Sequence, residues 1–156
     1  HTRSVFVTGV QTCALPICES VEAGVRHAIE AGLASAVRFL NGDATDYATY
    51  KHIGPANIVL VCGVWGHVPA EDRAQLVRAI ASLCKPAGAL IWTRGLSRGV
   101  QRLQEIEALF AGTSWEQVRA SATSDKRSAV ATYRYCGPPC ELPESGRIFH
   151  FRRRAG

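Results

Sequence analysis

Apolar and polar positions divide this chain into alternating strand-like and helix-like segments. Five apolar residues follow one another at Ile58–Cys62, and such a run suits a strand whose two faces are both buried, as in a parallel sheet. We therefore expect a strand over Asn57–Cys62. Gly63 and Gly66 follow it, so the backbone should turn sharply just past the strand's carboxyl end. The other strands predicted from short apolar runs are Val37–Leu40, Ala89–Thr93, Trp115–Ala120, Ala129–Tyr135 and Arg147–Phe151.

Apolar residues at helical spacing predict three helices. Val21, Val25 and Ile29 recur at every fourth position and form one apolar face of a helix over Ser20–Glu30. Gly32 is the expected left-handed stop of that helix. A second helix should open at Pro69, because the missing N–H of a proline costs no hydrogen bond in a first turn. This helix should turn Leu76, Val77, Ile80 and Leu83 inward and end at Lys85–Gly88, and the third should run from Val100 to Phe110.

Strand and helix patterns alternate along the chain, separated by short loops that contain glycine or proline. This alternation predicts an α/β fold with a mostly parallel sheet. The last three strands are separated by loops alone, so they should form an antiparallel C-terminal edge. In open sheets of this class, ligands bind beyond the carboxyl ends of the strands. The candidate site therefore lies at the turn after Cys62.

Composition indicates the class of protein. The chain has 156 residues, 47% of them hydrophobic and 20% charged, which suits one globular domain with its own core. No apolar run approaches the roughly 20 residues that a membrane-spanning helix needs. We expect a cytoplasmic protein with no membrane partner. The net charge of +5 includes the cluster Arg152–Arg154, which is typical of a solvated tail, so nucleic acid is not the expected partner.

Six cysteines raise the question of a metal or redox site. Cys62 lies in the predicted buried strand and Cys84 near a helix end, and these two do not form the close pair that structural zinc requires. Cys136 and Cys140 flank Gly-Pro-Pro, one proline more than in a redox Cys-Gly-Pro-Cys, and they follow a strand instead of opening a helix. We expect buried or loop thiols, a proline-rich connection and no metal.

The first 17 residues differ in origin from the rest. Val7–Ile17 resembles the in-frame translation of a common sequencing-library adapter, and His1–Arg3 resembles the end of the same adapter's upstream half. The alternative is a native strand, since Val5, Phe6 and Val7 suit one. We interpret residues 1–17 as an adapter-derived, non-native segment and exclude them from the functional argument.

Four segments of the remaining chain together resemble a known family. They are Gly32–Leu33, Val37–Ala44, Ile58–Val64 and Leu83–Gly88, and their order and spacing resemble the second half of a class I S-adenosylmethionine-dependent methyltransferase. Residues 85–88, Lys-Pro-Ala-Gly, are similar to the family's Lys-Pro-Gly-Gly turn with one glycine replaced. The resemblance implies a Rossmann-like methyltransferase sheet, N-terminally truncated, with residues 18–156 as the C-terminal part of a single domain.

The resemblance also implies S-adenosyl-L-methionine as cofactor. In the family, the acidic residue after the third strand binds the adenine amino group, and Asp43 matches it. The backbone of the next residue packs on the adenine ring, and Ala44 matches that residue. The alternative is that Asp43 only makes a turn or caps the next helix. The family's wall beside the methionine part of the cofactor matches Cys62, Gly63, Val64 and Trp65.

Three residues at this edge have alternatives of their own. Trp65 either covers the site or packs in the core. His67 is the candidate catalytic base for an incoming hydroxyl or amine, and its alternative is an ordinary loop histidine near a helix start. Arg94, just past the next predicted strand, is placed to meet an acidic group of a substrate.

These features predict an enzyme that transfers a methyl group from S-adenosyl-L-methionine to a small molecule. The first alternative is a non-catalytic adenosine-ligand or interaction module of the same fold, and the second is a nucleic-acid binder using Arg147 and Arg152–Arg154. No Gly-x-Gly-x-x-Gly occurs in the chain. The resemblance implies that the family's first two strands, its glycine-rich first motif and the acidic residue that binds the ribose lie upstream of these residues. We therefore expect this polypeptide to be poorly stable, to bind the cofactor weakly or not at all, and to be inactive as it stands. We also expect Ser4–Val10 to lie beside Asn57–Cys62 as a substitute strand.

Overall fold

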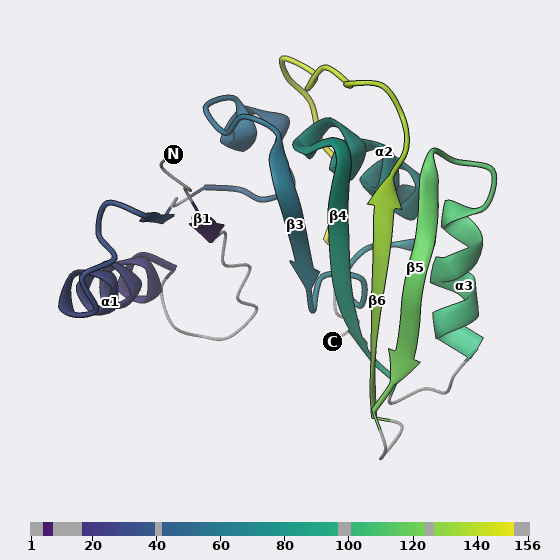
Figure 1. The fold of residues 1–156 in the computed structure, drawn as a ribbon, viewed down its shortest axis with the longest axis horizontal. Coiled ribbons are helices and arrows are strands. Elements are labelled where there is room, and N and C mark those ends of the chain that lie inside the picture. The colour runs from purple at the N-terminus through teal and green to yellow at the C-terminus, as the bar shows by residue number, and fades with distance from the viewer. Residues whose placement is uncertain (1–4, 8–16, 40–41, 97–100, 124–126, 152–156) are drawn as a thin grey trace. The chain divides into compact units, whose positions relative to one another are not determined.

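A computed structural model describes residues 5–7, 17–39, 42–96, 101–123 and 127–151 (Figure 1). The chain divides into two compact units, His1–Ala44 and Thr45–Gly156. Several sequence predictions fall outside the described residues: the strand end at Leu40, the helix start at Val100, most of the adapter-like segment and the cluster Arg152–Arg154.

The first unit contains one helix and a two-stranded parallel sheet. Helix α1 (Ile17–Glu30) begins three residues before the predicted start, and β1 (Val5–Val7) pairs in parallel with β2 (Val37–Phe39). The prediction that Ser4–Val10 would lie beside Asn57–Cys62 is therefore wrong, because the described part of that segment pairs with β2. Short apolar strands pair with whichever strand edge is open nearby, and β2 offers one within the same unit.

The end of α1 confirms the predicted glycine stop. Gly32 has a φ of +69°, in the left-handed region that favours glycine. The N–H of Leu33 donates to the carbonyl of Ala28 at 2.7 Å, and the N–H of Gly32 donates to that of Ile29 at 3.0 Å. These two bonds form the Schellman arrangement, which satisfies carbonyls that a helix end leaves without partners.

The second unit is built on a four-stranded mixed sheet. Its strands are β3 (Ala56–Cys62), β4 (Cys84–Gly95), β5 (Trp115–Ala122) and β6 (Ser128–Tyr135), in the order β3-β4-β6-β5. Strands β3 and β4 are parallel, whereas β6 is antiparallel to both of its neighbours. The α/β class and the antiparallel C-terminal part of the sheet are therefore confirmed.

The helices of this unit connect the strands. A 3-10 turn, η1 (Tyr47–Tyr50), precedes β3, and a second one, η2 (Ala70–Asp72), leads into α2 (Arg73–Leu83). Helix α3 (Gln101–Phe110) joins β4 to β5 (Figure 1). Because α2 links two parallel strands, its first turn lies at the carboxyl edge of the sheet and its last turn at the amino edge.

The sequence predicted that the second helix ends at Lys85–Gly88, and this prediction is wrong, because the segment lies in β4. Helix α2 ends at Leu83, and β4 begins at the next residue. Ala56 pairs with Cys84 and Ile58 with Ala89, so β4 carries four residues between these pairs where β3 carries one. The excess is a bulge at the amino edge of the sheet.

Helices α2 and α3 cover one face of this sheet. Side chains from alternate strand positions pack against the inward faces of both helices in a single core. The residues that contribute to it include Val61, Leu90, Trp92, Ala131 and Tyr133 from the strands, and Leu76, Val77, Ile80, Ile106 and Phe110 from the helices.

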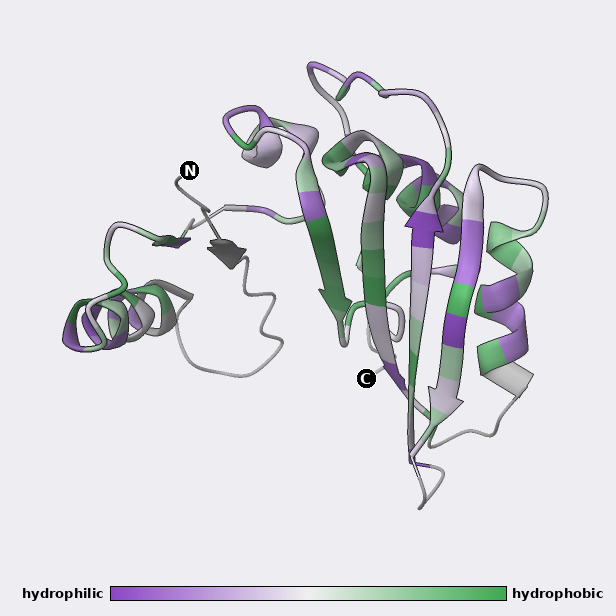
Figure 2. Ribbon diagram, in the orientation of Figure 1, coloured by the Kyte–Doolittle hydropathy of each residue, from purple (hydrophilic) through white to green (hydrophobic). Residues whose placement is uncertain are grey.

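The opposite sheet face is largely exposed within this unit, which contradicts the expectation that both faces of Asn57–Cys62 are buried. Figure 2 shows β3 as the most continuously apolar strand, yet Ile58 is 59% exposed and Leu60 is 63% exposed. Val118 and Val130 are also exposed. An uninterrupted apolar run indicates which residues prefer burial, but it does not say whether a helix covers each face.

The predicted strand over Arg147–Phe151 is also wrong. This segment makes a single antiparallel bridge between Asp46 and Arg147, and no further ladder. It is nevertheless anchored, because the N–H of Ile148 donates to the carbonyl of Thr45 at 2.7 Å and Phe149 is buried. The rings of Phe149 and Phe151 meet edge to face with centroids 5.2 Å apart.

Candidate functional site

The turn after β3 has the conformation that the sequence predicted. Strand β3 ends at Cys62, and Gly63 has a φ of +72°. A side chain at this position would be strained, since only glycine adopts such a φ at low cost. Cys62, Gly63 and Gly66 are all exposed. The carboxyl end of β3 therefore presents a sharp, open turn.

The rest of this loop is anchored in the core. Trp65 and Val68 are fully buried, and the ring of Trp65 meets Trp92 edge to face with centroids 5.9 Å apart. A second edge contact joins Trp65 to Phe110 at 6.2 Å. The structure thus gives Trp65 the packing role that the sequence left as its alternative, and the ring has no free face for a ligand. Val64 packs against the same core.

His67 lies on this loop in a half-buried position. Its backbone N–H donates to the carbonyl of Val64 at 2.9 Å, which closes a tight turn. Among the described residues, no carboxylate pairs with its side chain. The structure brings His67 to the same edge as Cys62 and Gly63.

Asp43 and Ala44 belong to the first unit. Asp43 is exposed and engaged in interactions of its own, and Ala44 is half-buried. Asn41, two residues before Asp43, lies outside the described residues. The exposed carboxylate is compatible with the expected contact to an adenine amino group, which needs an accessible acceptor.

Arg94 is inside a strand, not beyond one. Strand β4 continues to Gly95, two residues past the predicted Thr93, and Arg94 pairs with Ala129 of β6. The residue as a whole is only 4% exposed. The predicted contact between Arg94 and an acidic substrate group is therefore not supported, because the strand carries this residue into the interior.

A carboxylate and a histidine that are far apart in the sequence meet at the carboxyl edge of the sheet. Asp72, in η2 before α2, accepts the backbone N–H of His150 at 2.7 Å, and the same oxygen lies 3.2 Å from His150 Nδ1. The backbone hydrogen bond, together with the imidazole, holds the pKa of Asp72 below its usual value. Sequence analysis missed this pair because 78 residues separate its members and no motif connects them.

The two cysteines of the proline-rich loop are free thiols in a loop, as expected. The Tyr135 hydroxyl donates to the carbonyl of Pro138 at 2.9 Å and contacts the sulfur of Cys140 at 2.9 Å. The hydrogen bond to Cys140, with burial, raises the pKa of Tyr135 to about 12. Within the part of the chain that the structure describes, no group of three or more His, Cys, Asp or Glu residues could hold a metal.

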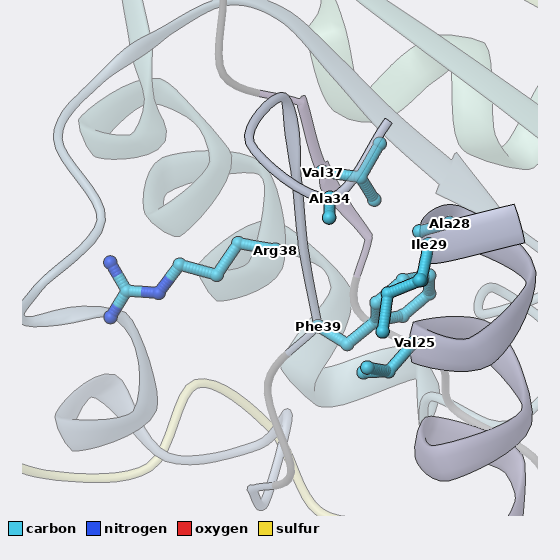
Figure 3. A pocket seen from close by; sticks show the side chains of 7 residues that line it. All are labelled: Val25, Ala28, Ile29, Ala34, Val37, Arg38 and Phe39. Carbon is cyan, nitrogen blue, oxygen red and sulfur yellow. The ribbon is translucent and has the colours of Figure 1, made fainter. Parts of the chain in front are cut away.

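A shallow apolar pocket of about 260 Å³ lies in the first unit between α1 and β2 (Figure 3). Val25, Ile29 and Phe39 contribute its apolar walls, while the Arg38 side chain points away from them. None of the site residues predicted from the sequence lines it. We therefore do not assign the cofactor to this pocket.

Comparison with known proteins by sequence matches no protein-family model and no curated protein. Solved structures do resemble the chain. They include the N-methyltransferase NodS from Bradyrhizobium japonicum WM9, at a TM-score of 0.57 and 12% identity, with 86% of this chain and 74% of that one covered. An O-methyltransferase family 2 protein from Planctomyces limnophilus, solved with apigenin, matches at a TM-score of 0.58 and 17% identity, with 74% of this chain and 40% of that one covered. A Streptococcus agalactiae protein of the NADB-Rossmann superfamily matches at a TM-score of 0.56 and 13% identity, with 85% of this chain and 52% of that one covered.

This chain has a Rossmann-like α/β fold with a mixed sheet, which the methyltransferases among these structures share. At these identities the likeness concerns the fold alone. This chain spans about half the length of the Streptococcus agalactiae protein and less than half that of the Planctomyces limnophilus protein. No helix among the described residues is both long and apolar enough to cross a bilayer.

Proposed function

We propose that this chain is the C-terminal part of a methyltransferase that transfers a methyl group from S-adenosyl-L-methionine to a small molecule in the cytoplasm. The observation that carries the proposal is the open Gly63 turn at the carboxyl end of β3, in a sheet whose parallel pair is followed by an antiparallel strand. Residues 1–17 are, in this proposal, non-native, and residues 18–156 belong to one domain.

The proposal assigns roles to residues of the two units, each unit taken separately. Asp43 accepts a hydrogen bond from the adenine amino group, and the small Ala44 leaves room for the ring. Cys62, Gly63 and Val64 provide backbone close to the methionine part of the cofactor, where glycine permits close approach. Trp65 has an indirect role, because its packing against Trp92 fixes the loop in the core.

The chemistry demands alignment more than acid–base power. The cofactor supplies a methyl group on a positively charged sulfur that leaves readily. The chain's residues have to hold the acceptor in line with that group and exclude water. The buried anchors Trp65 and Val68 serve this purpose by making the loop rigid.

The second candidate is a non-catalytic adenosine-ligand or interaction module. The burial of Trp65 and Arg94 favours it, because two polar or aromatic groups expected at the edge are withdrawn into the core. Both candidates would bind an adenosine ligand, but only the methyltransferase would form a methylated product.

Calorimetric titration with S-adenosylhomocysteine tests the proposal, using this chain and an extended chain in which the natural upstream sequence replaces residues 1–17. We expect weak binding by this chain, tighter binding by the extended one, and a loss of about tenfold on Asp43→Asn, the magnitude of one hydrogen bond to a charged group. Asp46→Asn is the matched control, since Asp46 caps η1 through the N–H of Ala48. Absence of binding by the extended chain would refute the proposal, and binding without methyl transfer would favour the module.

A further inference from the structure

We propose that His150, oriented by Asp72, is the base that takes the proton from the methyl acceptor. This inference rests on the proposed methyl transfer and names a residue for it. Asp72 is the positioning residue, since it acts only through the imidazole.

The contact between the two residues fixes the imidazole. One carboxylate oxygen of Asp72 receives the backbone N–H of His150 at 2.7 Å and lies 3.2 Å from its Nδ1. The pKa of Asp72 is lowered, so its carboxylate is charged at neutral pH. A charged carboxylate at Nδ1 favours the tautomer in which Nδ1 carries the hydrogen. The lone pair of Nε2 is then free to accept a proton.

The surroundings hold this pair in place and leave it accessible. The neighbours Ile148 and Phe149 are buried, so the backbone of His150 is anchored on one side by core contacts. The Asp72 side chain is 19% exposed, whereas that of His150 is 71% exposed. A restrained carboxylate beside an accessible imidazole is the arrangement that general-base catalysis requires.

The pair lies at the edge of the sheet where the ligand is expected. Asp72 follows the loop that leaves the carboxyl end of β3 and directly precedes α2, whose first turn is at that edge. His150 is hydrogen-bonded to Asp72 and therefore lies at the same edge of the sheet. His67 shares this edge, but among the described residues no carboxylate orients it.

The proposed step is balanced in atoms and charge. A lone pair of the acceptor oxygen or nitrogen forms a bond to the methyl carbon, and the bond from that carbon to sulfur breaks with its electron pair left on sulfur. The sulfur becomes a neutral thioether. The proton of the acceptor moves to Nε2 of His150 and later to water.

The first test reads the tautomer of His150 by nitrogen-15 NMR of the full chain, independently of any activity. We expect neutral His150 to carry its hydrogen on Nδ1, and Asp72→Ala to shift the population towards Nε2–H. Glu71→Ala, which removes the neighbouring exposed carboxylate, should leave the tautomer unchanged. An Nε2–H tautomer in the unsubstituted chain would overturn the proposal. If Asp72→Ala does not fold, Asp72→Leu, whose side chain also has no acceptor, gives the same readout.

The second test follows methyl transfer to a panel of phenols and amines from radiolabelled S-adenosyl-L-methionine. We expect His150→Gln to lower kcat about 100-fold with cofactor binding unchanged, as removal of a general base does. The control His52→Gln, at an exposed histidine in the loop before β3, should lower it less than twofold. An unaltered kcat in His150→Gln would contradict the inference. Absence of methyl transfer by the extended chain refutes the proposed function instead, and the tautomer measurement then decides whether Asp72 orients His150 as a base.

Discussion

Leu60 and Leu90 lie in neighbouring parallel strands of one sheet but face opposite sides of it. Leu60 is 63% exposed, and Leu90 is fully buried beneath α2 and α3. Leu90→Ala should lower the free energy of unfolding by about 2–5 kcal/mol through lost burial and a cavity. Leu60→Ala should change it by less than about 0.5 kcal/mol, as exposed positions usually do. Urea unfolding of both variants measures this, and equal losses would mean that the face of Leu60 is covered in solution.

Ala87 has a φ of +62°, a conformation that an L side chain adopts at a cost. Residues 85–88 resemble a Lys-Pro-Gly-Gly turn, which would have glycine at this position. Ala87→Gly should therefore raise the free energy of unfolding by about 0.5–1 kcal/mol, the strain removed minus the added chain entropy. The control is Ala89→Gly in the regular part of β4, which should lower it. A loss of stability in Ala87→Gly would contradict the strain.

Cys84 is a buried thiol, and burial raises its pKa to about 11. At pH 8 only about a thousandth of it is thiolate, which is the reactive form. A thiol reagent should therefore label the exposed Cys136 readily and Cys84 only in urea. Peptide mass spectrometry after timed labelling checks this. Rapid labelling of Cys84 without denaturant would show that β4 opens near its start.

Alkaline pH should destabilise the second unit. Burial, with a contribution from the charge of Glu107, raises the pKa of Tyr133 from 10.0 to about 12, and burial raises that of Cys84 from 9.0 to about 11. Between the unfolded and folded values the folded state binds more protons, so stability falls as pH rises from about 9. Urea midpoints at pH 8 and pH 10.5 measure the fall. Tyr133→Phe should reduce it, and an unchanged midpoint in the parent chain would contradict the prediction.

The sequence predicted the elements that depend on local pattern. The spacing of Val21, Val25 and Ile29 located α1, and Gly32 marked its end. Gly63 marked the turn after β3, since a positive φ requires glycine there. The antiparallel C-terminal part of the sheet followed from strands joined by loops alone.

Features that depend on distant neighbours could not be predicted. Arg94 is buried because β4 extends to Gly95 opposite Ser128, and partner strands set such ends. Trp65 is equally suited to a core and to a site, so only its contact with Trp92 decides between them. His150 and Asp72 come together through folding, with 78 residues between them.

The bulge of β4 has a practical consequence. Lys85 and Pro86 are exposed at the amino edge of the sheet, and the turn at Gly63 is at the opposite edge. Regular pairing between β3 and β4 resumes at Ala89, after the extra residues of the bulge. Extra residues at this position would project into solvent without shifting the strands. A fluorescent reporter or affinity tag inserted between Lys85 and Pro86 would thus leave the opposite edge free for binding assays.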